Sequence, residues 1–252
     1  MIVMQYANNG DLLSYLDQNI NKLTWGMKFR CLRDIAYDIR VIHNAGSVHC
    51  DLHSGNIVLH DNISVPEIDF LTSEPYICDF SLSRSVNSSE PNSTIRGVLP
   101  FIAPEVFHNG KFTQKSDIYA LGIIMYLIAT GDPPFRDREF DRNLVCDIMG
   151  GLRPPMPDSA PEEYKKLAEQ CCDADPEKRP RNISKLWEDM CNLTDEVYKN
   201  TSDDNEWNAI YHTDVRPLSQ LERESKYSSK LLPTGDLPKP RNDSAAGMKT
   251  KN

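Results

Sequence analysis

The stretch that most restricts how this chain can fold is SDIYALGIIMYLIAT, at residues 116–130. Its side chains are apolar nearly all the way round a helix, and such a helix has to be surrounded by protein. The chain has 252 residues, which is long enough to build a sizeable core around it. No apolar run is long enough to span a membrane. We therefore predict that residues 116–130 form a helix in the middle of a domain.

Further helices are predicted on both sides of this central one. Residues 25–43 repeat apolar side chains at steps of three and four, as at Leu32, Ile35 and Ile39, which gives one apolar helix face. Gly46 is suited to ending that helix. Three more helices are predicted near residues 138–149, 161–171 and 182–199.

Two short apolar runs predict a β hairpin. The runs are Ile57–Leu59 and Tyr76–Cys78, and the polar loop between them at residues 61–75 is long for a hairpin. Residues 79–100 are rich in Ser, Asn and Arg with little periodicity, which is typical of a mobile loop. The predicted fold class is therefore α+β, mostly α-helical, with a small β hairpin.

The composition excludes some partners. The chain has 28 basic and 37 acidic residues and a net charge of −9, which argues against a nucleic-acid partner. A nucleotide bound with Mg²⁺ is compatible with this charge, because carboxylates can hold the metal. The first residues, MIVMQYANNG, lack the features of a signal peptide, and the seven cysteines show no paired spacing. We expect a cytoplasmic protein with no membrane partner.

The last part of the chain differs from the rest. Residues 200–252 are polar, contain prolines and end NDSAAGMKTKN, so we predict a largely disordered C-terminal tail. The sequence leaves open whether this tail docks on the domain. The apolar residues with which it could do so are Leu218, Leu221, Leu231 and Leu232.

Three polar residues stand out beside the predicted hairpin. Asp51 follows a helix, Asn56 lies five residues later, and Asp79 follows a short strand. Phosphoryl transfer needs such groups, because one carboxylate takes the proton of the attacking hydroxyl while an amide and a second carboxylate hold Mg²⁺. Taken singly, each of the three could equally be an ordinary turn residue.

In chain order these residues resemble a known family. HCDLHSGN, from residue 49, resembles the H-R-D-x-x-x-x-N catalytic loop of eukaryotic protein kinases, Asp79-Phe80-Ser81 resembles their D-F-G, and A-P-E stands at residues 103–105. The chain is thus similar to the C-terminal lobe of a protein kinase of the tyrosine-kinase-like group. The resemblance implies Asp51 as the catalytic base, Asn56 and Asp79 as Mg²⁺ ligands, and ATP as cofactor.

The same resemblance implies a nucleotide seat and two structural contacts. MQYANNGD resembles the hinge, which would bind adenine through its backbone and ribose through an acidic side chain. An ion pair between Glu105 and Arg179 is implied, as is a role for Asp117 in anchoring the catalytic loop. The implied nucleotide-binding residues are Met4, Gln5, Tyr6, Ala7, Asp11 and Val58.

The chain also departs from the family pattern. Cys50 replaces the Arg of H-R-D, which removes the usual partner of a phosphorylated activation loop. His53 stands where serine/threonine-specific members have Lys; it can still donate a hydrogen bond to a phosphate, so we count it among the catalytic residues. Val98 replaces their Thr and cannot form a side-chain hydrogen bond. Specificity for serine or threonine is the default expectation for the group.

No Gly-rich phosphate loop and no V-A-I-K lysine precede the hinge-like stretch. We therefore expect residues 1–199 to be a partial kinase domain, with hinge and C-lobe only and poor activity in isolation. A longer protein is the expected source of the chain, and a protein that begins at Met1 is the alternative. The surface that would face the N-lobe invites a covering partner.

Three functions therefore remain open from the sequence. The first is a protein kinase that takes ATP and a protein substrate. The second is a catalytically impaired binding or scaffold module of the pseudokinase type. The third is an unrelated helical protein, which the ordered motifs disfavour.

Overall fold

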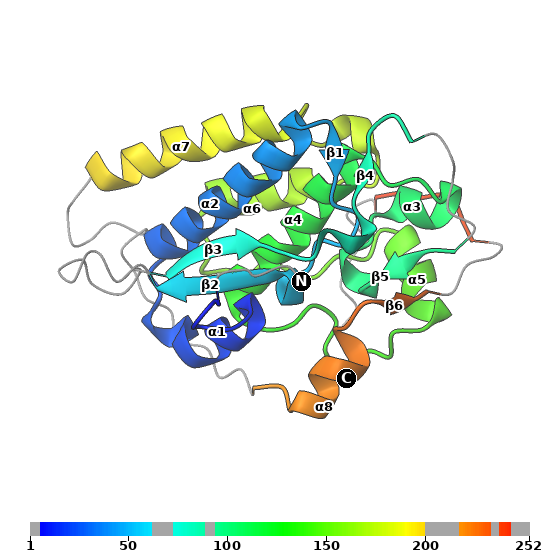
Figure 1. Ribbon diagram of the computed structural model, residues 1–252, viewed down its shortest axis with the longest axis horizontal. Coiled ribbons are helices and arrows are strands. Elements are labelled where there is room, and N and C mark those ends of the chain that lie inside the picture. The colour runs from blue at the N-terminus through cyan, green and yellow to red at the C-terminus, as the bar shows by residue number, and fades with distance from the viewer. Residues whose placement is uncertain (1–5, 62–72, 89–93, 200–216, 233–236, 243–252) are drawn as a thin grey trace.

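The protein is described by a computed structural model, which covers residues 6–61, 73–88, 94–199, 217–232 and 237–242. Helices dominate this part of the chain, and the strands pair antiparallel two by two, as β1 with β4, β2 with β3, and β5 with β6 (Figure 1). The strands are β1 Ser47–Val48, β2 Ile57–Asp61, β3 Ser73–Ile77, β4 Arg84–Ser85, β5 Arg96–Gly97 and β6 Lys230–Leu231. The helices are α1 Leu12–Asn19, α2 Trp25–Asn44, α3 Pro104–Asn109, α4 Gln114–Thr130, α5 Arg142–Met149, α6 Glu162–Cys171, α7 Ile183–Lys199 and α8 Gln220–Lys226.

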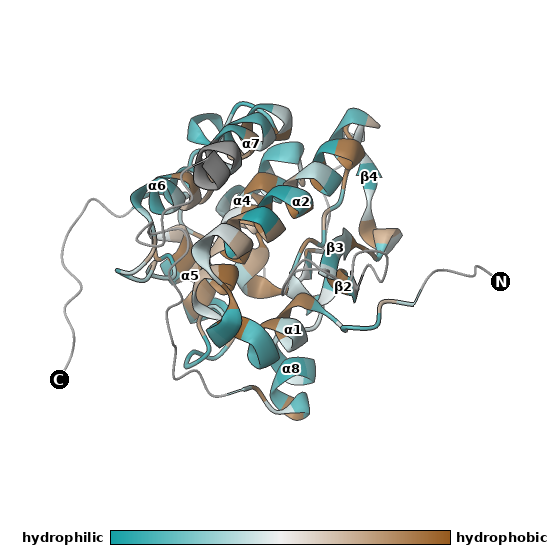
Figure 2. Cartoon of the chain, turned by 90° about the vertical axis from the view of Figure 1, so that its left-hand side faces the viewer, coloured by the Kyte–Doolittle hydropathy of each residue, from teal (hydrophilic) through white to brown (hydrophobic). Residues whose placement is uncertain are grey.

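The central helix predicted from the sequence is confirmed. α4 is buried along its whole length from Ser116 to Ala129, with α2 and α6 packed against it. It begins with a capping box between Thr113 and Ser116, and it ends at Gly131, whose left-handed backbone suits glycine. In Figure 2 its brown apolar residues lie inside the group of helices, whereas α6 and α7 show teal polar residues outward.

The long helix predicted at residues 25–43 is also confirmed, as α2. The side chain of Thr24 accepts a hydrogen bond from the backbone of Met27 and so caps its first turn. Leu32, Ile35 and Ile39 all lie on the buried face, as their spacing predicts. α2 packs against both α4 and α7, so it joins the centre of the domain to its outer layer.

The predicted hairpin forms from β2 and β3, with Ile57 opposite Ile77. The preceding chain runs along the other side of β2, because the Asn9 N–H donates to the Leu59 carbonyl at 3.1 Å and the Leu59 N–H to the Gly10 carbonyl at 2.9 Å. The hairpin is therefore held between the hinge-like segment and α2, which contacts β3.

The loop predicted at residues 79–100 contains more regular structure than expected. β4 pairs with β1, and β5 pairs with β6, which lies more than a hundred residues later in the chain. Two-residue strands have no readable alternation, and their partners are distant in sequence, so the local pattern did not reveal them. The short helices α1 and α3 were also not predicted, because helices of 8 and 6 residues are too short for an apolar period to repeat clearly.

Part of the tail is ordered, contrary to the disorder expected for residues 200–252, and its residues 200–216, 233–236 and 243–252 lie outside the described residues. Residues 217–232 form α8 and β6, and the side chains of Leu218, Tyr227 and Leu232 are buried in the main apolar cluster. Two of the four leucines considered in the sequence, Leu221 and Leu231, are exposed. A capping box starts α8, but the ordering of this segment comes mainly from tertiary contacts.

Within the described ranges, every helix is too short or too polar to cross a membrane.

Candidate active site

The loop that carries Asp51 is held by hydrogen bonds to the Asp117 carboxylate, at the start of α4. One oxygen of Asp117 accepts from the His49 N–H at 2.9 Å and lies 2.9 Å from His43 Nε2. The other oxygen accepts from the Cys50 N–H at 3.2 Å. Asp117 is 2% exposed, so these bonds are formed away from water and hold the loop firmly. The anchoring role implied by the sequence is present in the structure.

Cys50 makes the sharp turn that presents Asp51. Its backbone is left-handed, with φ of 70°, which is uncommon for a residue with a side chain. Burial raises the pKa of its thiol to about 12, so the sulfur stays protonated at neutral pH. The structure thus favours a packing role for Cys50 over a reactive one.

Asp51 itself is buried, and its backbone is held on both sides. Its N–H donates to His49 Nδ1 at 3.3 Å, and its carbonyl accepts from the Asn56 side-chain amide at 2.9 Å. The Asp51 carboxylate has one oxygen, Oδ1, with no hydrogen-bond partner in the described chain. A buried acceptor without a partner is unfavourable in itself and is well suited to take a proton from an incoming hydroxyl.

Gly97 is the neighbour that leaves this oxygen room, and the sequence analysis missed it. A Cβ at Gly97 would stand 3.3 Å from Asp51 Oδ1 and 2.5 Å from the Ile102 side chain, and its φ is +152°. A side chain there would press on the carboxylate. A lone glycine in a loop rich in Ser and Asn carries no local signal of such a contact.

His53 lies beside Asp51, with Nε2 3.8 Å from Asp51 Oδ2. Its Nδ1 accepts from the Gly55 N–H at 3.1 Å, and its ring packs against Phe101. Burial lowers the pKa of His53, chiefly by penalising the charged form. In the neutral ring Nε2 therefore carries the proton and can donate it in a hydrogen bond.

Asn56 and Asp79 lie at one end of the hairpin, because Asn56 precedes β2 and the Cys78 N–H donates to the Asn56 carbonyl at 2.9 Å. Asp79 has a left-handed backbone, and its carboxylate accepts from the Ser81 N–H at 3.1 Å. This hydrogen bonding lowers the pKa of Asp79, so its carboxylate is ionised at neutral pH.

These two side chains could bind a magnesium ion whose remaining ligands are phosphate oxygens. The Asn56 amide nitrogen donates to the Asp51 carbonyl, so its side-chain oxygen is the atom that could bind a metal. Asp79 adds one charged oxygen donor. The described residues contain no group of three or more His, Cys, Asp or Glu side chains able to hold a metal alone. One carboxylate plus phosphate oxygens is a usual arrangement for Mg²⁺.

A pocket of about 240 Å³ opens beside Asp79. It is lined by several of the residues expected to hold adenine, and Met4 and Gln5 lie outside the described residues. Its apolar floor suits a flat aromatic ring. The lining residues are Tyr6, Ala7, Val58, His60, Tyr76, Ile77, Cys78, Asp79 and Phe80.

Asp11, the expected ribose contact, forms an isolated β-bridge with Val58. Its carboxylate caps α1 by accepting from the Ser14 N–H and hydroxyl, both at 2.9 Å. The structure therefore brings Asp11 to the pocket's edge, but part of its hydrogen-bonding capacity is used within the chain.

The ion pair implied between Glu105 and Arg179 is present. The Arg179 guanidinium, which is fully buried, donates two hydrogen bonds of 2.7 Å to the two Glu105 oxygens. It also donates to the backbone carbonyls of Asp173 and Lys115. This ion pair thus joins α3, which follows the segment that carries Gly97, to the loop before α7.

Comparison with known proteins agrees with this geometry. A family model described as "Protein tyrosine and serine/threonine kinase" matches residues 1–190. The serine/threonine-protein kinase RUNKEL of Arabidopsis thaliana is 32% identical over 75% of this chain, and the probable serine/threonine-protein kinase roco9 of Dictyostelium discoideum is 29% identical over 88% of it. The dual specificity protein kinase zakA of Dictyostelium discoideum is 29% identical over 75% of the chain.

These relatives are much longer than the chain, which spans 13% of RUNKEL, 7% of roco9 and 25% of zakA. The family match nevertheless covers the hinge-like segment, the loop of Asp51, Asp79 and the Glu105–Arg179 pair together. Because the matched residues make up more than half of the chain, the chain belongs to the protein kinase family.

Proposed function

We propose that this protein transfers the γ-phosphoryl group of ATP to a serine or threonine hydroxyl of a protein substrate. The observation that carries the proposal is the Asp51 carboxylate, buried and with one oxygen unpartnered, in a loop held by Asp117. The names of the relatives support the choice of serine or threonine. We place the protein in the tyrosine-kinase-like group, on the motifs in residues 49–105.

In this reaction the hydroxyl oxygen of the substrate forms a bond to the γ-phosphorus of ATP. The bond from that phosphorus to the bridging oxygen breaks, and ADP leaves with its electron pair. Asp51 orients the attacking hydroxyl and receives its proton. Mg²⁺, held by Asn56 and Asp79, would neutralise charge on the phosphates when bound.

His53 has a positioning part in the proposal. Its neutral Nε2–H lies on the side of the ring nearer to Asp51, and its Nδ1 already accepts a hydrogen bond from the Gly55 N–H. It can donate one hydrogen bond to a phosphoryl oxygen without adding charge. This differs from a lysine at that place, which would add a full positive charge.

The adenine ring would lie in the 240 Å³ pocket, over Val58 and against the backbone of residues 6–7. The exposed side chains around it, Tyr6, Tyr76 and Phe80, support a second element covering this face. That element would be an N-terminal lobe or a partner in its place, and residues 1–199 would then be the hinge and the C-lobe.

The test is phosphate transfer by the full native protein with Asp51→Asn. Removing the base should lower kcat by about 10²- to 10⁴-fold, with little change in folding. Asp147→Asn is the matched control, because that carboxylate is exposed and forms a surface ion pair with Arg138. Equal transfer by the wild type and the Asp51→Asn variant would overturn the proposal.

A binding or scaffold module is the second candidate, favoured by the replacement of three family residues at Cys50, His53 and Val98. It predicts that the cellular role of the protein survives both Asp51→Asn and Asp79→Ala. Loss of that role in both variants, with normal protein levels, would support the enzyme.

A further inference from the structure

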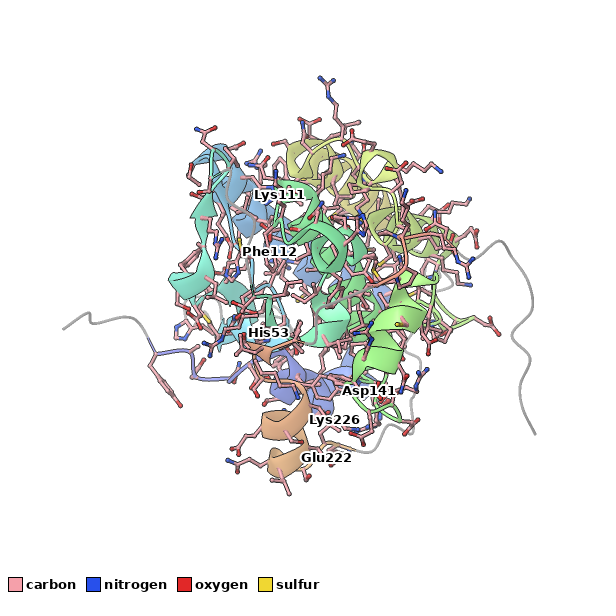
Figure 3. All side chains as sticks on the ribbon, turned by 90° about the vertical axis from the view of Figure 1, so that its right-hand side faces the viewer. His53, Lys111, Phe112, Asp141, Glu222 and Lys226 are labelled. Atoms are coloured by element: carbon pink, nitrogen blue, oxygen red, sulfur yellow. The ribbon has the colours of Figure 1, made fainter. Side chains whose placement is uncertain are left out.

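The tail segment at residues 217–232 lies across the segment that faces Asp51. β6 pairs with β5 in antiparallel register, with Lys230 opposite Gly97 and Leu231 opposite Arg96. The pairing is extended by the Leu232 N–H, which donates to the Ile95 carbonyl at 2.9 Å. In Figure 3, His53 lies just above this strand, and Lys226 and Glu222 follow on α8.

This position matters because Gly97 touches the proposed base. A Cβ on Gly97 would be 3.3 Å from Asp51 Oδ1, so Gly97 lies beside the proposed base, and β6 pairs with the strand that carries Gly97. If Asp51 is the base, a substrate hydroxyl has to reach this same carboxylate beside Gly97. An unpaired strand edge is a ready template for an extended peptide, and here the chain's own tail pairs with it.

Side-chain anchors hold the tail in place on both sides of β6. Leu232 and Tyr227 are buried, and the Tyr227 ring packs edge-on against Phe140 with its hydroxyl donating to the Pro134 carbonyl at 3.2 Å. Lys226 donates to the carbonyls of Arg136 and Arg138. Because two apolar side chains are buried in it, this contact is more stable than one made by exposed side chains alone.

A third anchor reaches the nucleotide side of the site. Arg223 on α8 forms an ion pair with the buried Asp17 carboxylate of α1, and it donates to the Ser14 hydroxyl at 2.8 Å. That hydroxyl donates in turn to Asp11, the proposed ribose contact. The tail therefore reaches from α1, beside the hinge-like segment, to β5, beside Asp51.

We propose that the edge of β5 is the docking surface for an extended protein substrate, and that residues 217–232 of this chain are its resident occupant. Substrate and tail then compete for one surface, so the tail must leave before a protein hydroxyl can reach Asp51. This inference rests on the proposed kinase function for the identity of the competitor, but the docking itself does not.

The test compares two double variants of the full native protein. Tyr227→Ala/Leu232→Ala removes buried anchors, whereas Leu221→Ala/Leu231→Ala, the matched control, removes exposed side chains from the same tail segment. The first should lower KM for the protein substrate by about 3- to 10-fold with kcat little changed, because it raises the fraction of open sites. The control should behave as the wild type.

Amide hydrogen exchange gives a readout that needs no activity. Peptides that contain residues 95–97 should lose protection in Tyr227→Ala/Leu232→Ala and keep it in the control. A synthetic peptide of residues 217–232, added to the first variant, should restore protection and should inhibit competitively against the protein substrate.

The outcomes separate the two proposals. Unchanged exchange and unchanged KM in Tyr227→Ala/Leu232→Ala would overturn the docking inference. Loss of protection with no phosphate transfer by any variant would support the docking surface and overturn the kinase function instead. Inhibition that is noncompetitive with the protein substrate would also overturn the competition.

Discussion

The two carboxylates of the site, Asp51 and Asp79, are held in very different ways. Asp51 is 4% exposed and sits in a loop fastened by Asp117, whereas Asp79 is exposed and is held by one local turn through Ser81. Asp51 has its supporting partners inside this part of the chain. The expected partners of Asp79 are a metal and phosphates, so its local geometry is left to a turn.

The difference teaches which part of the site is preorganised. Hydrogen bonds formed in a buried network are strong and keep their direction, so the proposed base is positioned before any substrate arrives. A solvent-exposed carboxylate with a lowered pKa keeps its charge but gains little positional stability. The predictions below test this contrast through the free energy of unfolding, from the largest change to the smallest.

The largest effect is expected for Asp117→Ala. The substitution leaves the N–H groups of His49 and Cys50 and the ring of His43 without their shared acceptor in a buried site. Unfolding in urea should show a loss of about 3–5 kcal/mol. Asp147→Ala, at an exposed ion pair with Arg138, should cost less than about 1 kcal/mol. Equal losses in the two variants would contradict the preorganised loop.

A smaller effect is expected for Gly97→Ala. The added methyl group meets Ile102 and Asp51, so overpacking should lower the free energy of unfolding by about 1–3 kcal/mol and displace the carboxylate. Gly46→Ala is the matched control, because its φ is also positive but nothing lies within 4 Å of the new Cβ. Losses of the same size at both positions would mean that backbone strain alone, and no contact with Asp51, requires glycine at residue 97.

Asp79→Ala should lower the free energy of unfolding by only about 0.5–2 kcal/mol, because the exposed side chain loses just its local hydrogen bond to the Ser81 N–H in a left-handed turn. In isothermal titration of the full-length Asp79→Ala variant, the affinity for ATP should nevertheless no longer depend on Mg²⁺. A large loss of stability would show that Asp79 is structurally fastened and would remove the contrast with Asp51. Retained Mg²⁺ dependence would remove Asp79 from the metal site.

The pH dependence should show a modest contribution from His53. Its folded-state pKa is lowered by burial, so the unfolded chain takes up the proton first as pH falls below about 6.5. The contribution is absent above that pH, and the folded state loses stability progressively below it, towards the lower folded pKa. Urea unfolding of His53→Gln should therefore lose stability less steeply than the wild type below pH 6.5. Parallel curves for the two proteins would contradict a buried, neutral His53.

Much of the fold was predictable because its signals are local. The apolar run of α4 indicates a helix that is buried on all sides, and the spacing of apolar residues along α2 indicates a helix that is buried on one face. The hairpin was predictable for the same reason. β4 and β5 were not, because two residues carry no period and their pairing depends on distant segments.

For the site, the order of Asp51, Asn56, Asp79 and the A-P-E run was enough to predict the protein kinase family, which the family match confirms, while the catalytic roles of these residues stay predictions. Sequence order could not show that Asp51 Oδ1 lacks a partner or that Gly97 leaves it room, because both depend on side chains meeting across the fold. Nor could it distinguish the buried leucines of the tail from the exposed ones.

By itself, then, the sequence determined the helices of the core, the hairpin and the identity of the polar residues beside it, since periodicity and residue type are properties of neighbours along the chain. Only the tertiary structure decided how Asp51 is isolated and where residues 217–232 lie. Burial, hydrogen bonding and strand pairing between segments that are far apart in sequence set both, and no local pattern records those contacts.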